Sequence, residues 1–299
     1  MARKPRGLLP ALGVAACLAL QLHAVPVFAS PTEAAALREK YDGMRDALAR
    51  NQFGRPLRLD SNETDSLLEG DIYGVVDYPF SVVSAALKDP AHWCDVLILH
   101  LNIKYCSVSG QGGNSNLTVY VGSKKPQTLS TSFRMDYGYR AAADEAGYLR
   151  QTMAAQKGPL GTKNYRMIFE AIPLEAGRSF LHVQYAYSQG MMARLATISY
   201  LNTVARDKVG FTVLEKNGGK PTYVSGLRGA VERNTMRYYL AIETYLGSLS
   251  TPPREQLGKR LGDWFAFTER YPRQLHEVSA DEYMGMKREE YFRQQHPGQ

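Results

Sequence analysis

Few residues in this chain have side chains that commonly perform chemistry, and two cysteines stand out by their spacing. Cys94 and Cys106 lie near the ends of the short apolar segment WCDVLILHLNIKYC. They could form a disulfide, bind a metal or include a nucleophile. His92 and His100 lie close by, but cysteines and histidines at this spacing match no standard zinc-ligand pattern. We therefore expect no metal site, and no neighbouring residue supports a nucleophile.

The N-terminal residues indicate the compartment in which these cysteines fold. Basic residues occur in the first six positions, an apolar run follows at 8–22, and small residues precede a polar segment at Ala29. This pattern is typical of a secretory signal peptide over residues 1–29, cleaved after Ala29. An uncleaved anchor helix and a lipid-modified Cys17 are the alternatives. We expect a periplasmic or secreted protein.

In an oxidising compartment, the two cysteines of a mature chain usually pair. Removal of Cys17 with the signal peptide would leave only Cys94 and Cys106. A bond between them closes a short loop and would stabilise the fold by about 3 kcal/mol. We expect this disulfide, with two free buried thiols as the main alternative.

Composition excludes some classes of function. The formal net charge is +7 for 299 residues, and three of these charges lie in the signal peptide, which leaves about +4. This charge is small and dispersed, so we expect no binding to nucleic acid. No P-loop, G-x-S-x-G, G-x-G-x-x-G or H-E-x-x-H motif occurs. We therefore expect no cofactor, no catalytic residue and no enzymatic activity.

His182 is the one histidine of the mature chain inside an expected strand. A single strand histidine is more often a hydrogen-bonded core residue than a general base. Asp71, Asp77 and Glu170 are isolated carboxylates of expected strands, for which ordinary surface pairing is the simpler role. If the chain were an enzyme, His182 with Glu170 or Asp136 would be its first candidate acid–base pair.

Hydrophobic periodicity predicts an order of elements. A helix is expected at 32–52, a polar segment at 58–66, a strand at 67–78 and two short helices at 81–97. Six antiparallel strands follow between 103 and 188, then a helix near 191–204 and a strand pair within 209–226. The strongest helix covers 226–249, and two amphipathic, mostly surface-lying stretches form the tail.

This order across residues 66–249 resembles the START-like (helix-grip, SRPBCC) superfamily, as an exported bacterial member. The resemblance lies in GDIYGVVDYPFSVVSAALKDPAHWCDVL and GLRGAVERNTMRYYLAIETYL. It implies an α+β fold in which a curved antiparallel sheet surrounds a long C-terminal helix, with extra N- and C-terminal helices. The expected division is a signal peptide (1–29), a helix and linker (30–65), a ligand-binding domain (66–250) and a helical extension (251–299).

The resemblance also implies a cavity for an apolar ligand between the sheet and the long helix. Because side chains alternate along a strand, one sheet face is rich in tyrosine and methionine. The expected ligand contacts are Phe133, Met135, Tyr137, Tyr139, Tyr165, Met167, Phe169, Tyr185, Tyr187, Met236, Tyr239 and Leu240. Arg233 and Arg237 of the long helix are expected to be surface salt-bridge partners, with binding of an anionic headgroup as the alternative. The helix near 191–204 is expected to be a lid that completes the core, with a gate or a membrane-touching helix as the alternatives.

The sequence therefore predicts a periplasmic protein that binds a hydrophobic small molecule or lipid, for transport or sensing, with possible transient membrane contact. A cyclase- or hydrolase-like enzyme using the same cavity is one alternative. A non-catalytic interaction protein whose core is filled by its own side chains is the other.

Overall fold

The computed structural model describes Met1 and residues 33–111, 114–144, 147–203, 207–217 and 220–296. Apart from Met1, the expected signal peptide lies outside these residues, as does Cys17. In the described part of the chain no helix is both long and apolar enough to span a membrane.

An eight-stranded antiparallel sheet forms the framework, in the order β1-β2-β8-β7-β6-β5-β4-β3. Its strands are β1 (Leu57–Glu63), β2 (Leu67–Val76), β3 (Ile103–Gln111), β4 (Asn114–Val121), β5 (Phe133–Asp144), β6 (Tyr148–Lys157), β7 (Thr162–Pro173) and β8 (Ser179–Gln189). A separate hairpin joins β9 (Val213–Asn217) to β10 (Lys220–Tyr223). The expected six strands after the two short helices are all present.

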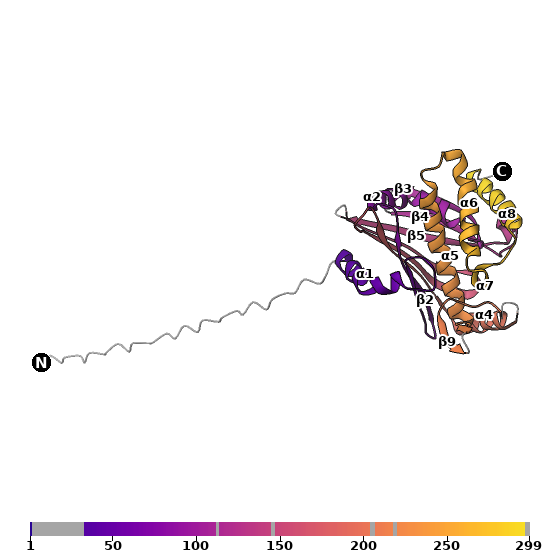
Figure 1. The fold of residues 1–299 in the computed structure, drawn as a ribbon, viewed down its shortest axis with the longest axis horizontal. Coiled ribbons are helices and arrows are strands. Elements are labelled where there is room, and N and C mark those ends of the chain that lie inside the picture. The colour runs from indigo at the N-terminus through magenta and orange to yellow at the C-terminus, as the bar shows by residue number, and fades with distance from the viewer. Residues whose placement is uncertain (2–32, 112–113, 145–146, 204–206, 218–219, 297–299) are drawn as a thin grey trace.

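Helices lie on both sides of this sheet. They are α1 (Glu33–Ala49), α2 (Phe80–Leu87), α3 (Pro90–Leu97), α4 (Met191–Thr203), α5 (Gly226–Ser248), α6 (Pro253–Glu269), α7 (Pro272–Leu275) and α8 (Ala280–Gln295). Helix α1 lies apart from α5, α6 and α8, across the sheet from them (Figure 1). The predicted α+β arrangement, in which the sheet packs against a long C-terminal helix, is confirmed.

Strand β1 corrects the expected linker, because residues 57–63 pair with β2 from Leu57↔Gly74 to Glu63↔Leu68. Its sequence, LRLDSNE, has few apolar residues. An edge strand needs a partner on only one side and is often polar. Leu57 at its start is fully buried and anchors the strand in the core.

The C-terminal tail corrects a second expectation. Trp264 of α6 and Tyr283 of α8 are almost completely buried, and their rings stack with centroids 5.0 Å apart. Lys287 is also buried, and its Nζ donates to the carbonyls of His100 and Ile103 at 2.9 and 2.7 Å. The expectation of a mostly surface-lying tail was wrong, because α6 and α8 complete the core.

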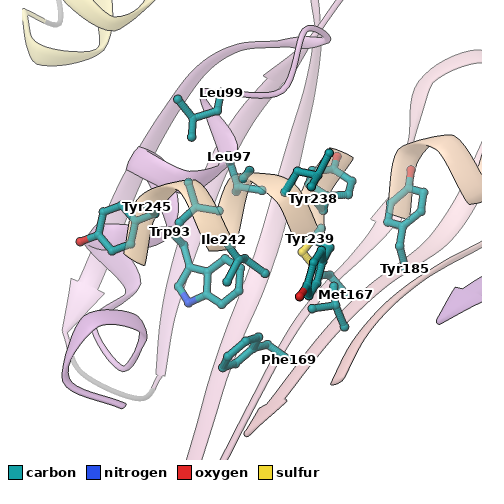
Figure 2. Close-up of a cluster of buried hydrophobic side chains, with 14 of the residues drawn as sticks. Trp93, Leu97, Leu99, Met167, Phe169, Tyr185, Tyr238, Tyr239, Ile242 and Tyr245 are labelled. Atoms are coloured by element: carbon teal, nitrogen blue, oxygen red, sulfur yellow. The ribbon is translucent and has the colours of Figure 1, made fainter. Parts of the chain in front are cut away.

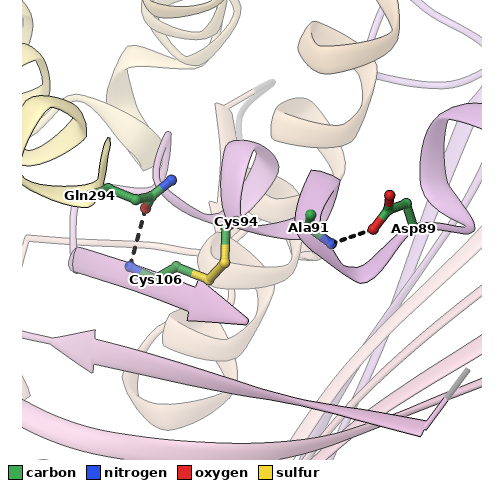
Figure 3. Close-up of a disulfide and its surroundings, with 5 residues drawn as sticks. All are labelled: Asp89, Ala91, Cys94, Cys106 and Gln294. Carbon is green, nitrogen blue, oxygen red and sulfur yellow. Dashed lines mark hydrogen bonds between the residues drawn. A yellow bond between two sulfur atoms is a disulfide. The ribbon is translucent and has the colours of Figure 1, made fainter. Parts of the chain in front are cut away.

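Cys94 and Cys106 form a disulfide between α3 and β3, with their Cα atoms 5.2 Å apart. Helix α3 begins after Asp89, whose carboxylate accepts from the Ala91 backbone N–H at 2.8 Å (Figure 3). On the other side, the Cys106 backbone N–H donates to Gln294 of α8 at 3.1 Å. The predicted pairing is confirmed, and it links the first short helices to the sheet beneath the tail.

Helix α5 packs on β2 at a distance that only glycine permits. A Cβ at Gly74 would lie 2.3 Å from the hydroxyl oxygen of Tyr239, and one at Gly70 would lie 2.4 Å from Oγ1 of Thr235. Tyr239 is 1% exposed, so its ring has no room to move away. The even-numbered residues of β2 therefore face α5, and the odd-numbered ones face the side of α1.

Gly74→Ala should lower the free energy of unfolding by about 1–3 kcal/mol, because the added methyl overpacks the buried Tyr239 ring. Gly258→Ala is the matched control, since that glycine lies on an exposed position of α6 with nothing within 4 Å. The control should stabilise the protein by about 0.5–1 kcal/mol. Urea unfolding of both variants measures these changes, and an unaffected Gly74→Ala protein would contradict the close packing.

Replacing Cys94 and Cys106 together by alanine should lower the free energy of unfolding by about 3 kcal/mol, since the bond restricts the unfolded chain. Wild-type protein should lose similar stability in reductant, and the double variant should not respond to reductant. Equal stability of the oxidised wild type and the double variant would contradict this role.

Candidate functional site

Four tyrosines, which we call the tyrosine cluster, gather on the sheet face that looks towards α5: Tyr165 of β7, Tyr185 and Tyr187 of β8, and Tyr238 of α5. The rings of Tyr165 and Tyr187 stack with centroids 5.1 Å apart, and Tyr185 lies 5.2 Å from Tyr238. Each residue is at most 8% exposed. Figure 2 shows Tyr185 and Met167 of the sheet with Tyr238 on the helix.

The structure places most of the expected ligand contacts in one buried core. Ten of them lie in the main hydrophobic cluster: Met135, Tyr139, Tyr165, Met167, Phe169, Tyr185, Tyr187, Met236, Tyr239 and Leu240. Tyr137 is partly buried and packs against that cluster. Phe133 is 38% exposed, because it sits at the first position of β5 opposite Val121, where the strand leaves the core.

Two of the expected contacts have a clear packing role. The Tyr139 hydroxyl donates to the Lys88 carbonyl at 3.0 Å and so fixes the segment between α2 and α3. Tyr239 fills the space above Gly74. The Tyr139 hydroxyl and the Tyr239 ring therefore serve packing within the fold.

The hydroxyls of Tyr187 and Tyr238 make no hydrogen bond to the residues that the structure describes, and neither oxygen is among the buried side-chain atoms that lack a partner. Buried tyrosine hydroxyls usually have a partner. Burial raises the pKa of both residues, so both hydroxyls stay protonated and available as donors at neutral pH. These two groups are where the cluster can receive a polar atom of another molecule.

Helix α4 and the short 3-10 helix η2 (Pro159–Gly161) carry a group of exposed apolar side chains, which we call the apolar rim. Met191 and Met192 are 77% and 78% exposed, and Leu195 is 55% exposed. Leu160 of η2 is 82% exposed, and the neighbouring Gly161 lies close to Ala193 of α4. Large apolar side chains that cluster on a surface often mark an interaction site.

Arg233 and Arg237 of α5 are not at the surface, and the expectation of surface salt bridges was wrong. They are 5% and 2% exposed. Arg233 Nη1 donates to the Val209 carbonyl at 3.1 Å, and Arg237 Nη2 donates to Glu277 at 2.8 Å. The loop before α8 and the segment before β9 cover this side of α5, which explains the burial of both guanidinium groups.

His182 lies on the opposite face of the sheet, beneath α1. Its Nδ1 is 2.6 Å from Glu170 and its Nε2 is 2.8 Å from Asp71, and its ring stacks on Tyr73 with centroids 4.5 Å apart. Asp136 is not a partner, because it binds Arg134 and Thr118 on the far part of the sheet. His182 is thus a hydrogen-bonded core residue with both ring nitrogens occupied.

A shallow pocket of about 240 Å³ adjoins this histidine and is lined by Glu33, Ala36, Leu37, Lys40, Tyr73, Arg150, Glu170 and His182. Burial alone would lower the pKa of His182, but hydrogen bonds and charge from Asp71 and Glu170 outweigh burial and raise it. Burial would raise the pKa of Glu170, whereas His182 and Tyr148 lower it. The pair therefore favours the imidazolium form. Among the described residues, no group of three His, Cys, Asp or Glu side chains is arranged to hold a metal ion.

The His182 network should make stability depend on pH. Because the pKa of His182 is raised by folding, its contribution is complete below the ordinary pKa of about 6.5 and is lost as pH rises through the folded value. The difference in unfolding free energy between wild type and His182→Gln should therefore be larger at about pH 6 than at about pH 9. His276→Gln, which removes an exposed histidine paired with Glu269, should show little difference at either pH. A His182→Gln difference independent of pH would contradict the imidazolium form.

Searches with the sequence find no matching family model and no matching curated protein. Among solved structures, a protein of Thermus thermophilus aligns with 61% of this chain and 99% of its own, at 10% identity and a TM-score of 0.39. Human StAR-related lipid transfer protein 5 aligns with 72% of this chain and 96% of its own, at 11% identity and a TM-score of 0.36. Truncated norcoclaurine synthase from Thalictrum flavum aligns with 48% and 91%, at 12% identity and a TM-score of 0.33. The order of strands and helices in this chain, with α2 and α3 after β2 and with α5 after β8, α4, β9 and β10, agrees with the element order expected from the sequence.

Proposed function

We propose that this protein is an exported binding protein that holds one hydrophobic ligand between the tyrosine cluster and helix α5, for transport or sensing. The observation that carries the proposal is the pair of hydroxyls of Tyr187 and Tyr238, which lie among buried rings and make no hydrogen bond to another residue in the described part of the chain. The apolar rings around them suit a ligand body, and the two hydroxyls suit its polar atoms. The basic start and apolar run of residues 1–29 support export.

The driving force would be removal of apolar ligand surface from water, at about 25 cal/mol per Å². The sheet supplies most of the contact surface, because Tyr165, Met167, Tyr185 and Tyr187 lie side by side on β7 and β8. Methionine adapts its shape to irregular neighbours, which suits a ligand that enters and leaves.

Helix α4 is the proposed route of exchange. Its exposed Met191, Met192 and Leu195, together with Leu160, give an apolar rim that suits transient contact with a membrane. Helix α4 also packs against α5, so movement of α4 would open the side of the tyrosine cluster. A ligand could then pass between membrane and protein without crossing water.

Binding fits the positions of the ionisable groups better than catalysis does. His182, the first candidate for an acid–base pair, lies on the sheet face away from α5, and carboxylates occupy both of its nitrogens. We therefore propose a non-catalytic function for the side of the sheet that faces α5.

Native mass spectrometry of protein purified from its own compartment, followed by solvent extraction and lipid analysis, tests the proposal. We expect one apolar ligand per chain, and uptake of a fluorescent phospholipid by the stripped protein. Protein that is consistently empty and takes up no fluorescent lipid would overturn the proposal and favour a filled-core interaction protein.

Tyr187→Phe and Tyr238→Phe should each weaken ligand binding by about 0.5–1.5 kcal/mol, or roughly three- to tenfold, because each removes one hydrogen bond and keeps the ring. Their unfolding free energies should stay near the wild-type value. Tyr139→Phe is the matched control, since its hydroxyl bonds to Lys88 and not to the proposed ligand. It should lose stability and keep affinity. The reverse pattern would place the ligand elsewhere.

A further inference from the structure

Four basic side chains, which we call the cation cluster, meet beside the tyrosine cluster: Lys124, Lys208, Arg233 and Arg237. Three of them share one carboxylate. Glu277 is 2.6 Å from Lys124 Nζ, 2.8 Å from Arg237 Nη2 and 3.5 Å from Lys208 Nζ. Arg233 is the fourth cation, and its hydrogen bond goes to the Val209 carbonyl. Positive charge therefore exceeds negative charge around Glu277.

Glu232, the neighbour of Arg233 on α5, does not balance this excess by direct contact. One oxygen, Oε2, accepts from the backbone N–H groups of Phe211 and Thr212 at 2.5 and 2.9 Å. The other, Oε1, accepts from the hydroxyls of Thr212 and Ser61 at 2.6 and 2.5 Å. Glu232 thus anchors β1 and the segment before β9 to α5, and its oxygens are occupied.

Two buried donors at this place also lack acceptors among the described residues. Arg237 Nε is buried without a partner, and so is His100 Nε2. His100 is 2% exposed, and its Nδ1 accepts from the Asn102 backbone N–H at 3.1 Å. A neutral imidazole whose Nδ1 accepts must carry its proton on Nε2, so both unpaired atoms are N–H donors. Buried donors are normally satisfied.

The electrostatics of the cluster agree with this geometry. Burial and the charge of Arg237 lower the pKa of Lys124 to about 8, although Glu277 opposes the change. Burial and Arg237 likewise lower the pKa of Arg233 to about 10. For His100, burial and the positive charges of Arg237, Lys287, Lys124 and Lys104 lower the pKa, which keeps the ring neutral. A negative charge added here would oppose the lowering of all three pKa values.

The cation cluster adjoins the tyrosine cluster on α5, where Arg237 directly precedes Tyr238. The His100 ring stacks on Tyr238 with centroids 4.7 Å apart. Burial raises the pKa of Tyr238 and of Tyr187. The charge of Arg237 opposes this rise for Tyr238, and the charge of Arg233 opposes it for Tyr187. One molecule could therefore place its apolar body on the tyrosines and an oxygen-rich end at the arginines.

We infer that the cation cluster binds the oxyanion group, a carboxylate or phosphate, of an amphiphilic ligand whose apolar chain lies on the tyrosine cluster. This inference rests on the proposed function and narrows its ligand class from hydrophobic molecules to anionic amphiphiles. Guanidinium groups suit such oxygens, because their N–H donors match the geometry of carboxylate and phosphate. Arg233, Arg237 and His100 Nε2 supply the donors, and Lys124 adds charge.

The test compares ligands that share one acyl chain and differ in their head groups. Palmitate, monopalmitoyl phosphatidic acid and monopalmitoylglycerol would compete for stripped protein against a neutral fluorescent probe, N-phenyl-1-naphthylamine. The two anionic ligands should bind about tenfold or more tightly than the neutral glycerol ester. Arg233→Gln should remove most of this preference and leave affinity for monopalmitoylglycerol unchanged.

Arg228→Gln is the matched control, because Arg228 lies on the same helix but its guanidinium Nε donates to the Ser61 hydroxyl, while its backbone N–H donates to Glu63. It should keep the preference for anionic ligands. Lys124→Gln, outside the helix, is a second variant that should weaken the preference if Arg233→Gln impairs folding, and Arg233→Lys should restore part of it. Circular dichroism confirms the fold of each variant.

The outcomes separate the two proposals. Equal affinity for all three ligands would contradict the inference that the cation cluster binds an oxyanion group, and it would leave the proposed binding function unaffected. A different outcome is that inorganic phosphate alone stabilises the protein against heat as much as the anionic amphiphiles do, with the effect lost in Arg233→Gln. This result would show a site for a free anion and would contradict the inference that the ligand is an amphiphile. Failure of all three ligands and of the probe to bind would remove the proposed function itself.

Discussion

The direct contact between helix α5 and strand β2 is the constraint on which the rest of the structure depends. Gly70 and Gly74 leave no side chain between the two elements, so Thr235 and Tyr239 rest on the strand backbone. A helix held this close buries residues around most of its circumference. The sheet lies on one side, and α3, α6 and α7 cover others. The helix therefore carries both core packing and the polar groups of the candidate site, and polar side chains on it must find partners inside the protein.

Much of the fold could be predicted because it depends on local patterns. Alternation along the strands and helical spacing at 226–249 predict the sheet and α5, and the expectation of an oxidising compartment predicts the disulfide between Cys94 and Cys106. Strand β1 could not be predicted, because its polar residues look like a linker and only pairing with β2 makes them a strand. The burial of Trp264 and Tyr283 was missed for a similar reason. An amphipathic helix in sequence does not show which distant surface will cover its apolar face.

The candidate site was predictable only in its apolar half. Strand alternation places Tyr185 and Tyr187 on the face towards α5 and His182 on the other face, as the register of β8 with β2 shows. For Arg233 and Arg237 the sequence favoured surface salt bridges, with an anionic headgroup only as the alternative. Arginines four residues apart on a helix, with glutamates nearby, are typical of a solvated face. Their burial depends on residues far away in sequence, such as Lys124 and Glu277, and no local pattern indicates that approach.

Other buried cations of the described residues have a fuller set of partners than Arg237, whose Nε has none. Lys104 and Lys287 share the two oxygens of Glu290 and also donate to backbone carbonyls. Arg260 bonds Asp95, Ser248 and Gln256, and its guanidinium lies over the Tyr245 ring. The fold thus satisfies buried charges where they serve packing alone. A buried donor without an acceptor costs free energy, and such costs tend to persist where function requires them. Arg237 Nε and His100 Nε2, the two unpaired donors near Tyr238, are the observations from which an anionic end of the ligand is proposed.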